Sequence, residues 1–291
     1  MSPRISILVT DYKAPEYTRF CIESIKKASF KDIEILTRDN SRRNVGLATS
    51  SNLLAHKAKG EYLFFLNNDT IVKRNIFEEL LKSKFDITGC KMYDYSGKVE
   101  LDSALSLDKF GLPAGKTGPT FYPDGAIFMK RKVFEELGGF DGKLFLYGED
   151  RDLCWRAWLA GYRVGVSTSA VFYHNTHSVG PTNYFQRYHS EKNVIRSMLK
   201  NLSTKSLLKI FPQYVFCSIL ELGFILLTKP MALFRSYLPA YWWNIKHLKC
   251  TLKLRKKVVH KIPDSELPFS KVVGKFYVLQ TQGVPQWRRR S

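Results

Sequence analysis

The stretch KGEYLFFLNNDT, residues 59–70, decides the fold class because an apolar run ends there in a polar turn. Residues 62–66 are continuously apolar and have the length of a buried strand. Asn67, Asn68 and Asp69 follow directly. Their oxygen atoms suit a hard divalent cation, although Asn and Asp also favour turns and helix caps. Taken alone, the stretch predicts a strand that ends in a turn or cap, with a metal site as the alternative.

Short apolar runs alternate with helical patterns on both sides of this stretch. Residues 5–9 and 33–37 are predicted strands, and residues 47–58 and 72–85 are predicted helices. Alternation of this kind predicts an α/β fold with parallel strands and crossover helices on both faces of the sheet. Ligands bind such sheets at the carboxyl ends of the strands. The polar residues at 67–69 lie at one of these ends.

The following part of the chain begins with a segment that has no clear periodicity. Residues 92–124 are rich in Gly, Pro, Lys and Asp, and we predict a long loop that acts as a lid or binds the acceptor. Periodicity returns after this loop. We predict strands at 125–129, 163–166 and 171–173, and helices at 131–137 and 150–160, the last ending at Gly161.

Two further groups of residues can carry chemistry. Glu149, Asp150 and Asp152 begin a predicted helix, where capping accounts for acidic residues. The helix N-terminus is expected to keep Asp150 ionised, so that it can accept a proton from a hydroxyl group in a nearby cleft. His174 follows a predicted strand and can ligate a metal, or it is a polar loop residue like His177.

The order of these blocks resembles a family 2 glycosyltransferase of the GT-A fold, of the kind that includes rhamnosyltransferases of bacterial polysaccharide assembly. The resemblance covers residues 5–200. It implies a Rossmann-like mixed sheet with helices on both faces, over a catalytic domain at 1–204. The matching blocks are ISILVTDY, RDNS, NVGLATSSN, KGEYLFFLNNDT, VFEELGGFD and YGEDRDLCWRAWLAGYRV, with YHNTHS after them.

The resemblance also implies a role for each matching residue. Asp150 matches the catalytic base, and Asp69 matches the metal-binding acid of the DxD motif. His174 matches a further metal ligand, and Mn²⁺ or Mg²⁺ is the cofactor implied. The residues implied to bind the nucleotide sugar are Thr10 and Tyr12 at the pyrimidine base, Asp39 at its ring nitrogen, Asn44 and Gly46 in a nearby turn, Asn67 at the ribose, and Asn68.

Two positions depart from the family pattern. Asn67 replaces the first acid of the DxD motif and supplies a neutral oxygen instead. Asp11 and Lys13 flank Tyr12 where relatives often have Ser or Thr and Asn, so both UDP- and dTDP-sugars remain as donors. The implied reaction is a single in-line displacement that inverts the anomeric carbon, as in an inverting hexosyltransferase of polysaccharide biosynthesis. In it, Asp150 takes the proton of the acceptor.

The charge of the chain is uneven. The chain has 46 Lys and Arg against 26 Asp and Glu, a net charge of +20. Residues 1–200 contain 30 against 23, and residues 201–291 contain 16 against 3, a net charge of +13 for the second part. This excess predicts an anionic partner, either nucleic acid or a membrane surface. Five scattered cysteines and the lack of an N-terminal apolar signal segment predict a cytoplasmic location.

The second part, residues 205–291, is predicted to be a helical, membrane-associating extension. Residues 206–228 are strongly apolar, and a helical wheel puts Lys209, Gln213 and Glu221 along one edge. An apolar helix with aromatic and basic residues after it is typical of peripheral binding, here to the inner face of the cell membrane. A glycan or lipid-linked acceptor is expected there. The alternative is that these helices pack on the catalytic domain or on a second subunit, as a homo-oligomer interface.

Two other functions are weighed against the transferase. A nucleic-acid-binding protein would explain the pI of 9.7 and the sequence Arg288-Arg289-Arg290. However, the basic excess lies among apolar aromatic residues, and no nucleic-acid-binding motif is recognised, so we expect no nucleic acid partner. A non-catalytic nucleotide-sugar binder would explain Asn67. The presence of Asp69, Asp150 and His174 together argues against it.

Overall fold

The computed structural model describes residues 3–175, 183–228 and 235–272, and His177, Phe234 and Arg288-Arg289-Arg290 lie outside these ranges. Its centre is a mixed sheet of eight strands in the order β2-β1-β3-β9-β5-β10-β4, with β6 paired to β5. The strands are β1 (Ile5–Asp11), β2 (Ile33–Asp39), β3 (Tyr62–Asn67), β4 (Thr70–Val72), β5 (Ile87–Asp94), β6 (Glu100–Leu101), β9 (Ala126–Lys130) and β10 (Val164–His174). The α/β prediction is confirmed.

Helices cover both faces of the sheet because its strands are apolar on both sides. In β3, Phe64 packs into one hydrophobic cluster with α1 (Pro15–Lys26) and α3 (Ile76–Leu81). The next residue, Phe65, packs into a second cluster on the opposite face. That cluster includes residues from α2 (Leu47–Lys57), α4 (Arg131–Glu136) and α5 (Glu149–Leu159).

Three sequence-based boundaries differ from the structure. The predicted helix at 72–85 is shorter, because residues 70–72 form β4, which pairs with β10. The predicted strands at 163–166 and 171–173 are one strand, β10, with a register shift between Ser167 and Val171. The predicted loop at 92–124 contains the end of β5, together with β6 and the small sheet of β7 (Ala104–Leu105) and β8 (Tyr122–Pro123).

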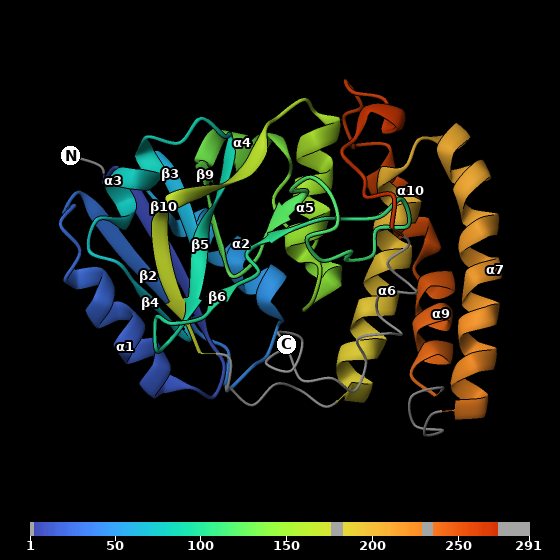
Figure 1. The fold of residues 1–291 in the computed structure, drawn as a ribbon, viewed down its shortest axis with the longest axis horizontal. Coiled ribbons are helices and arrows are strands. Elements are labelled where there is room, and N and C mark those ends of the chain that lie inside the picture. Colours follow the sequence, from blue (N-terminus) through green and yellow to red (C-terminus); the bar gives the residue numbers. More distant parts are fainter. Residues whose placement is uncertain (1–2, 176–182, 229–234, 273–291) are drawn as a thin grey trace.

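The C-terminal helices stand beside the sheet and side by side (Figure 1). They are α6 (Asn183–Asn201), α7 (Thr204–Thr228), α9 (Tyr237–Lys246) and α10 (Leu248–Arg255). Val194 and Met198 of α6 belong to the same hydrophobic cluster as Phe65 and Trp155. The predicted domain boundary at residue 204 therefore falls between two helices that share one core with the sheet.

A buried charge cluster joins α6 to the α/β part. Arg196 donates to both carboxylate oxygens of Asp141, at 2.8 and 3.1 Å. Lys200 donates to Asp141 at 2.9 Å and also reaches Asp152 of α5, at 2.7 Å in its shortest contact. All four side chains are almost completely buried, so each charge depends on the others for its compensation.

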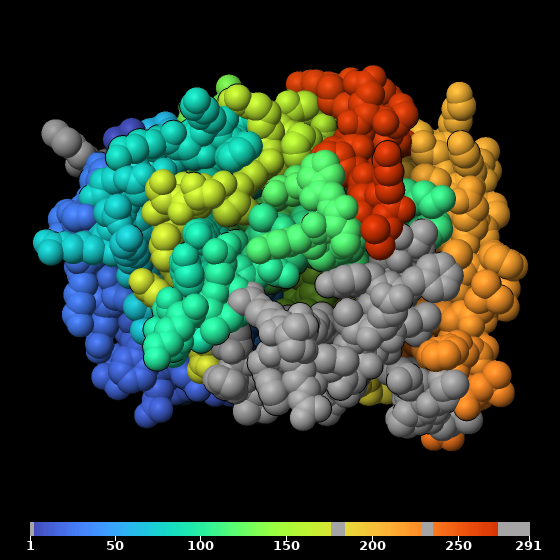
Figure 2. Space-filling view, in the orientation of Figure 1, coloured from blue at the N-terminus to red at the C-terminus, as the bar shows by residue number. Residues whose placement is uncertain are grey.

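On α7, Ser218 and Glu221 are buried, whereas several large apolar residues are exposed. Glu221 is 4% exposed and accepts a hydrogen bond of 2.8 Å from Tyr237 of α9. Phe216 and Leu227 are 63% and 86% exposed. In Figure 2, the residues of α7 (orange) form the edge of the molecule opposite the blue N-terminal residues. In the described residues, α7 is the one helix long and apolar enough to cross a membrane, by length and composition.

Candidate functional site

The carboxyl ends of three parallel strands meet at one edge of the sheet. Thr10, near the end of β1, pairs in register with Asn67 of β3 on one side and with Arg38 of β2 on the other. Asp39 ends β2 beside Asp11. Thr10 and Asn67, which were predicted to bind different parts of a nucleotide sugar, therefore occupy neighbouring positions.

Tyr12 and Asp39, which were predicted to bind the pyrimidine base of the donor, lie at the rim of this edge. Tyr12 is 48% exposed. Asp39 is exposed, and its carboxylate accepts a 2.7 Å hydrogen bond from the backbone N–H of Ser41. Hydrogen bonds from Ser41 lower the pKa of Asp39. Both side chains are open to a ligand, and their roles remain predictions.

The turn at residues 44–46, predicted to lie near the nucleotide, packs closely against the segment that precedes Asp150. Asn44 accepts a 2.9 Å hydrogen bond from the N–H of Gly46, which has φ of 82°. A Cβ atom at Gly46 would lie 2.5 Å from the carbonyl oxygen of Phe145. Only glycine fits both the backbone conformation and this close approach. The turn and the Phe145 segment are therefore fixed against each other.

Asp69, directly before β4, and His174, at the end of β10, lie together where these two strands pair antiparallel. Nε2 of His174 is 3.2 Å from Oδ1 of Asp69, and the backbone N–H of Asn175 donates to the Asp69 carbonyl at 3.0 Å. Burial disfavours the charged imidazole, but the hydrogen bond and charge of Asp69 outweigh it and raise the pKa of His174. Both side chains keep some exposure, 14% and 22%.

This pair fits a shared divalent cation. Two adjacent ligands of an octahedral ion, each bound at about 2.1 Å, lie about 3 Å apart, which is close to the observed separation. No group of three His, Cys, Asp or Glu side chains suited to a metal occurs in the described residues. A hard cation often completes its shell with water and substrate phosphates, so two protein ligands suit an ion that arrives with a diphosphate.

The side chain of Asn68 contacts α1. Its amide donates a 2.9 Å hydrogen bond to the hydroxyl of Thr18 on α1, and Thr18 donates to the buried carboxylate of Asp11 at 2.7 Å. This chain of hydrogen bonds fixes α1 to the ends of β1 and β3. The predicted contact of Asn68 with the nucleotide sugar remains a prediction.

Asp150 begins α5 and is partly exposed. Its carboxylate accepts a 2.7 Å hydrogen bond from the N–H of Arg151. Burial, with the charge of Asp124 second, raises the pKa of Asp150 to about 7. We expected the helix N-terminus to keep Asp150 ionised. That expectation is corrected, because burial raises the pKa by more than the backbone N–H groups of the helix N-terminus lower it. Burial also raises the pKa of Glu149 to about 8.

Asp124 is a further candidate site residue, which the sequence analysis missed. It precedes β9, and the carbonyl of the next residue, Gly125, accepts a 3.3 Å hydrogen bond from the N–H of Asn67. Burial raises the pKa of Asp124, while the charges of His174 and Arg151 oppose the rise. Asp124 therefore interacts electrostatically with the Asp69–His174 pair and with Asp150. The sequence did contain a signal for this residue, the pair Asp124-Gly125 directly before an apolar strand. It was overlooked because Asp124 ends the segment predicted to be a loop.

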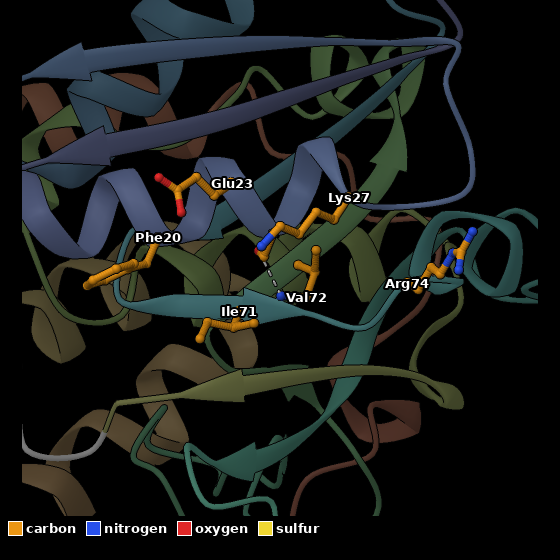
Figure 3. A pocket seen from close by; sticks show the side chains of 7 residues that line it. Phe20, Glu23, Lys27, Ile71, Val72 and Arg74 are labelled. Carbon is orange, nitrogen blue, oxygen red and sulfur yellow. Dashed lines mark hydrogen bonds between the residues drawn. The ribbon is translucent and has the colours of Figure 1, made fainter.

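A groove elsewhere on the α/β part contains none of the predicted site residues. It has a volume of about 530 Å³ and lies between α1 and β4 (Figure 3). Phe20, Glu23 and Lys27 of α1 line one side, and Ile71 and Val72 of β4 line the other. The candidate site is therefore the strand edge with Asp69, Asp124, Asp150 and His174.

Comparison with known proteins identifies the class. Residues 8–138 match the sequence model of glycosyl transferase family 2. The chain is 24% identical over 221 residues to the O-antigen biosynthesis protein RfbC of Myxococcus xanthus, covering 60% of this chain and 17% of that protein. It is 31% identical over 104 residues to glycosyltransferase GlyG of Streptococcus pneumoniae, covering 28% and 35%. Residues 8–138 thus have the sequence pattern of glycosyl transferase family 2.

A solved structure agrees on the fold. The structure of GalNAc-T7 with UDP, GalNAc and Mn²⁺ superposes with a TM-score of 0.59 at 15% identity, over 98% of this chain and 58% of that one. The fold is thus the GT-A fold with a helical C-terminal region. The chain spans only 17% to 38% of the length of the curated relatives that it matches.

Proposed function

We propose that the chain is a metal-dependent, inverting glycosyltransferase that moves a hexosyl group from a UDP- or dTDP-sugar to a glycan or lipid-linked acceptor. One observation carries this proposal. The Asp69–His174 pair interacts electrostatically with Asp124, and Asp124 interacts in the same way with Asp150. A cation site and a proton acceptor beside one strand edge are what transfer from a diphosphate requires. The GalNAc-T7 structure, which contains UDP, GalNAc and Mn²⁺, supports it.

In the proposed reaction, Asp69 and His174 would hold Mn²⁺ or Mg²⁺. The bound cation supplies charge neutralisation for the departing diphosphate. Thr10, Tyr12 and Asp39 would bind the nucleotide base at the rim of the sheet. Asn67, with a neutral amide in place of a second acid, would contact the ribose.

Asp150 would act on the acceptor. Its carboxylate takes the proton of the acceptor hydroxyl while that oxygen forms a bond to the anomeric carbon and the bond to the diphosphate breaks. A pKa of about 7 suits this task, because a general base works best when its pKa lies near the working pH. One displacement from the face opposite the leaving group inverts the anomeric configuration.

We further propose that α7 and α9 bind the anionic cytoplasmic face of a membrane. Exposed large apolar residues on these helices include Phe216, Ile219, Trp242 and Ile245, each more than 60% exposed. Large exposed apolar patches mark interaction surfaces in soluble proteins. The exposed lysines Lys246, Lys249 and Lys253 follow on α9 and α10. Basic residues beside an apolar helix face favour anionic lipid.

The test of the activity is a screen of nucleoside-diphosphate sugars by calorimetry, with and without Mn²⁺. The proposal expects one uridine or thymidine sugar to bind more tightly when Mn²⁺ is present. A product assay with the bound donor then reports transfer. Strong binding of RNA or DNA at physiological salt, with no binding of any nucleotide sugar, would overturn it.

A further inference from the structure

The segment just before Asp150 has an unusual backbone. Phe145 and Tyr147 have φ of 69° and 68°, and Gly148 has φ of 92°. Residues other than glycine rarely adopt this left-handed region because their Cβ atoms clash with the backbone. Such residues persist only where surrounding structure holds them, and they gather at functional sites. Something outside residues 144–148 must therefore stabilise this loop.

Asn193 of α6 supplies that restraint. Its side-chain nitrogen donates to the backbone carbonyls of Leu144, Leu146 and Tyr147, at 3.0, 2.9 and 2.6 Å. An amide has two N–H groups, so one of the hydrogen atoms is shared between two carbonyls. Asn193 is 1% exposed, so its amide makes these hydrogen bonds away from solvent. The loop thus bends around one amide group.

A second residue of α6 extends the restraint. Nζ of Lys192 donates to the carbonyls of Lys143 and Leu144, at 3.1 and 3.2 Å. The ring of Phe145 stacks on His189, with centroids 5.2 Å apart. Three residues of one helix therefore contact the loop.

The restrained loop touches both halves of the candidate site. At one end, Gly148 is the N-cap of α5, two residues before Asp150. At the other, the carbonyl of Phe145 accepts a 3.3 Å hydrogen bond from the N–H of Ala48 and lies against Gly46 of the predicted nucleotide turn. A shift of this loop would move Asp150 relative to the nucleotide turn.

We infer that Asn193 is a positioning residue, whose amide holds residues 144–148 so that Asp150 faces the bound donor. The inference rests on the proposed function. Asn193 touches no reacting atom and acts only through the loop. Reactions between two bound groups depend steeply on geometry, and a misplacement of about 1 Å can cost about 100-fold in rate.

The chain offers a matched control in Asn244 of α9. Asn244 is 4% exposed, and its side-chain nitrogen also donates to backbone carbonyls, those of Lys192 and Ala240, at 3.0 and 2.9 Å. The side-chain oxygens of Asn193 and Asn244 are both buried without a hydrogen-bond partner in the described parts of the chain. The two residues differ in that Asn193 bonds the loop and Asn244 bonds helices.

The experiment compares Asn193→Asp with Asn244→Asp in the full chain. Each substitution keeps the size of the side chain and removes its N–H donors. We expect both variants to lose melting temperature, and Asn193→Asp alone to lose at least about tenfold in kcat. KM for the donor should change by less than kcat, because the nucleotide contacts remain. Hydrogen exchange of residues 144–148 should quicken more in Asn193→Asp than in Asn244→Asp, because Asn244 reaches the loop only indirectly, through Lys192.

The outcomes separate this inference from the proposed function. Equal kcat in the two variants, well below both melting temperatures, would overturn the positioning role. Unchanged hydrogen exchange of residues 144–148 in Asn193→Asp would overturn the restraint itself, whatever the activity. A wild-type protein that binds and transfers no sugar would instead overturn the proposed function, while the exchange experiment would still report on the loop.

Discussion

Nε2 of His174 lies 3.2 Å from Oδ1 of Asp69, although 105 positions separate the two residues in the sequence. The antiparallel pairing of β10 with β4, in which His174 lies opposite Thr70, creates this contact. The contact links the turn after β3 to the last strand of the sheet, and it is the basis for the expected dependence on metal.

Asp69→Ala should abolish transfer, because it removes the only carboxylate of the pair. His174→Gln should weaken Mn²⁺ binding by about tenfold or more while some activity returns at high Mn²⁺, since one ligand and the bound phosphates remain. Titration of Mn²⁺ in the presence of UDP, followed by electron paramagnetic resonance, measures this binding directly. Full turnover in excess chelator would rule out the metal site.

Asp150→Asn should leave donor binding intact and lower kcat by about 10²- to 10⁴-fold, the usual contribution of a positioned general base. The amide keeps the size of the carboxylate and cannot accept the proton. Glu149→Gln is the control, because Glu149 is the adjacent buried acid and has no proposed role in the transfer. Single-turnover kinetics should separate the two variants, and a similar loss in both would exclude Asp150 as the base.

Asp124→Asn should move the acid limb of the pH profile to lower pH. Asp150 must be deprotonated to act, so kcat should rise with pH through about 7 in the wild type. The negative charge of Asp124 raises the pKa of Asp150, and removing that charge lets Asp150 ionise at lower pH. Profiles of kcat between pH 5 and about 9 measure the shift. A shift toward higher pH would contradict this electrostatic arrangement.

Phe216→Ser combined with Trp242→Ser should weaken sedimentation with anionic liposomes. The two side chains are 63% and 67% exposed on α7 and α9, and each would bury apolar area in the lipid interface. Phe20→Ser on α1, where the ring is 42% exposed, is the control for loss of an exposed aromatic residue. High salt should weaken binding without eliminating it, since salt screens the lysines and leaves apolar burial intact.

Should the wild-type protein stay in the supernatant at low salt, the membrane proposal fails. The apolar face of α7 and α9 would then be a subunit interface. Analytical ultracentrifugation of the same variants would reveal it as a change of oligomeric state.

Asp141→Asn should destabilise the fold by about 3–5 kcal/mol, because it leaves Arg196 and Lys200 with one buried negative partner fewer. Burial raises the pKa of Asp141, but the nearby Lys200 and Arg196 outweigh it, so the pKa lies below its usual value. The stabilisation is therefore complete above about pH 4, where the unfolded carboxyl is ionised, and is lost at lower pH.

Urea unfolding of the wild type and Asp141→Asn at pH 7 and at pH 3 measures both effects. The difference in unfolding free energy should shrink at the lower pH. Asp102→Asn is the control, because its ion pair with Lys116 is 49% exposed on both sides and contributes about 1 kcal/mol or less. An equal effect of the two substitutions would contradict the importance of the buried cluster.

The sequence predicted the strand at 62–66 and the polar turn after it because both depend on local pattern. It mistook residues 70–72 for helix, since their pairing with β10 is a contact across the whole domain. The ionisation of Asp150 was predicted in the wrong direction because burial depends on packing that no local pattern contains. Asp124 was missed for the same reason.

The orientation of α7 affects the handling of the isolated protein. In its C-terminal half, Ser218 and Glu221 make their hydrogen bonds inside the helical bundle, so water on the outer side of that half meets mainly hydrocarbon. Water around such a face is released when any apolar surface covers it. In buffer without lipid, the available cover is detergent or another copy of the same helix. We therefore expect the purified chain to self-associate as its concentration rises, and mild detergent or anionic lipid to return it to single molecules.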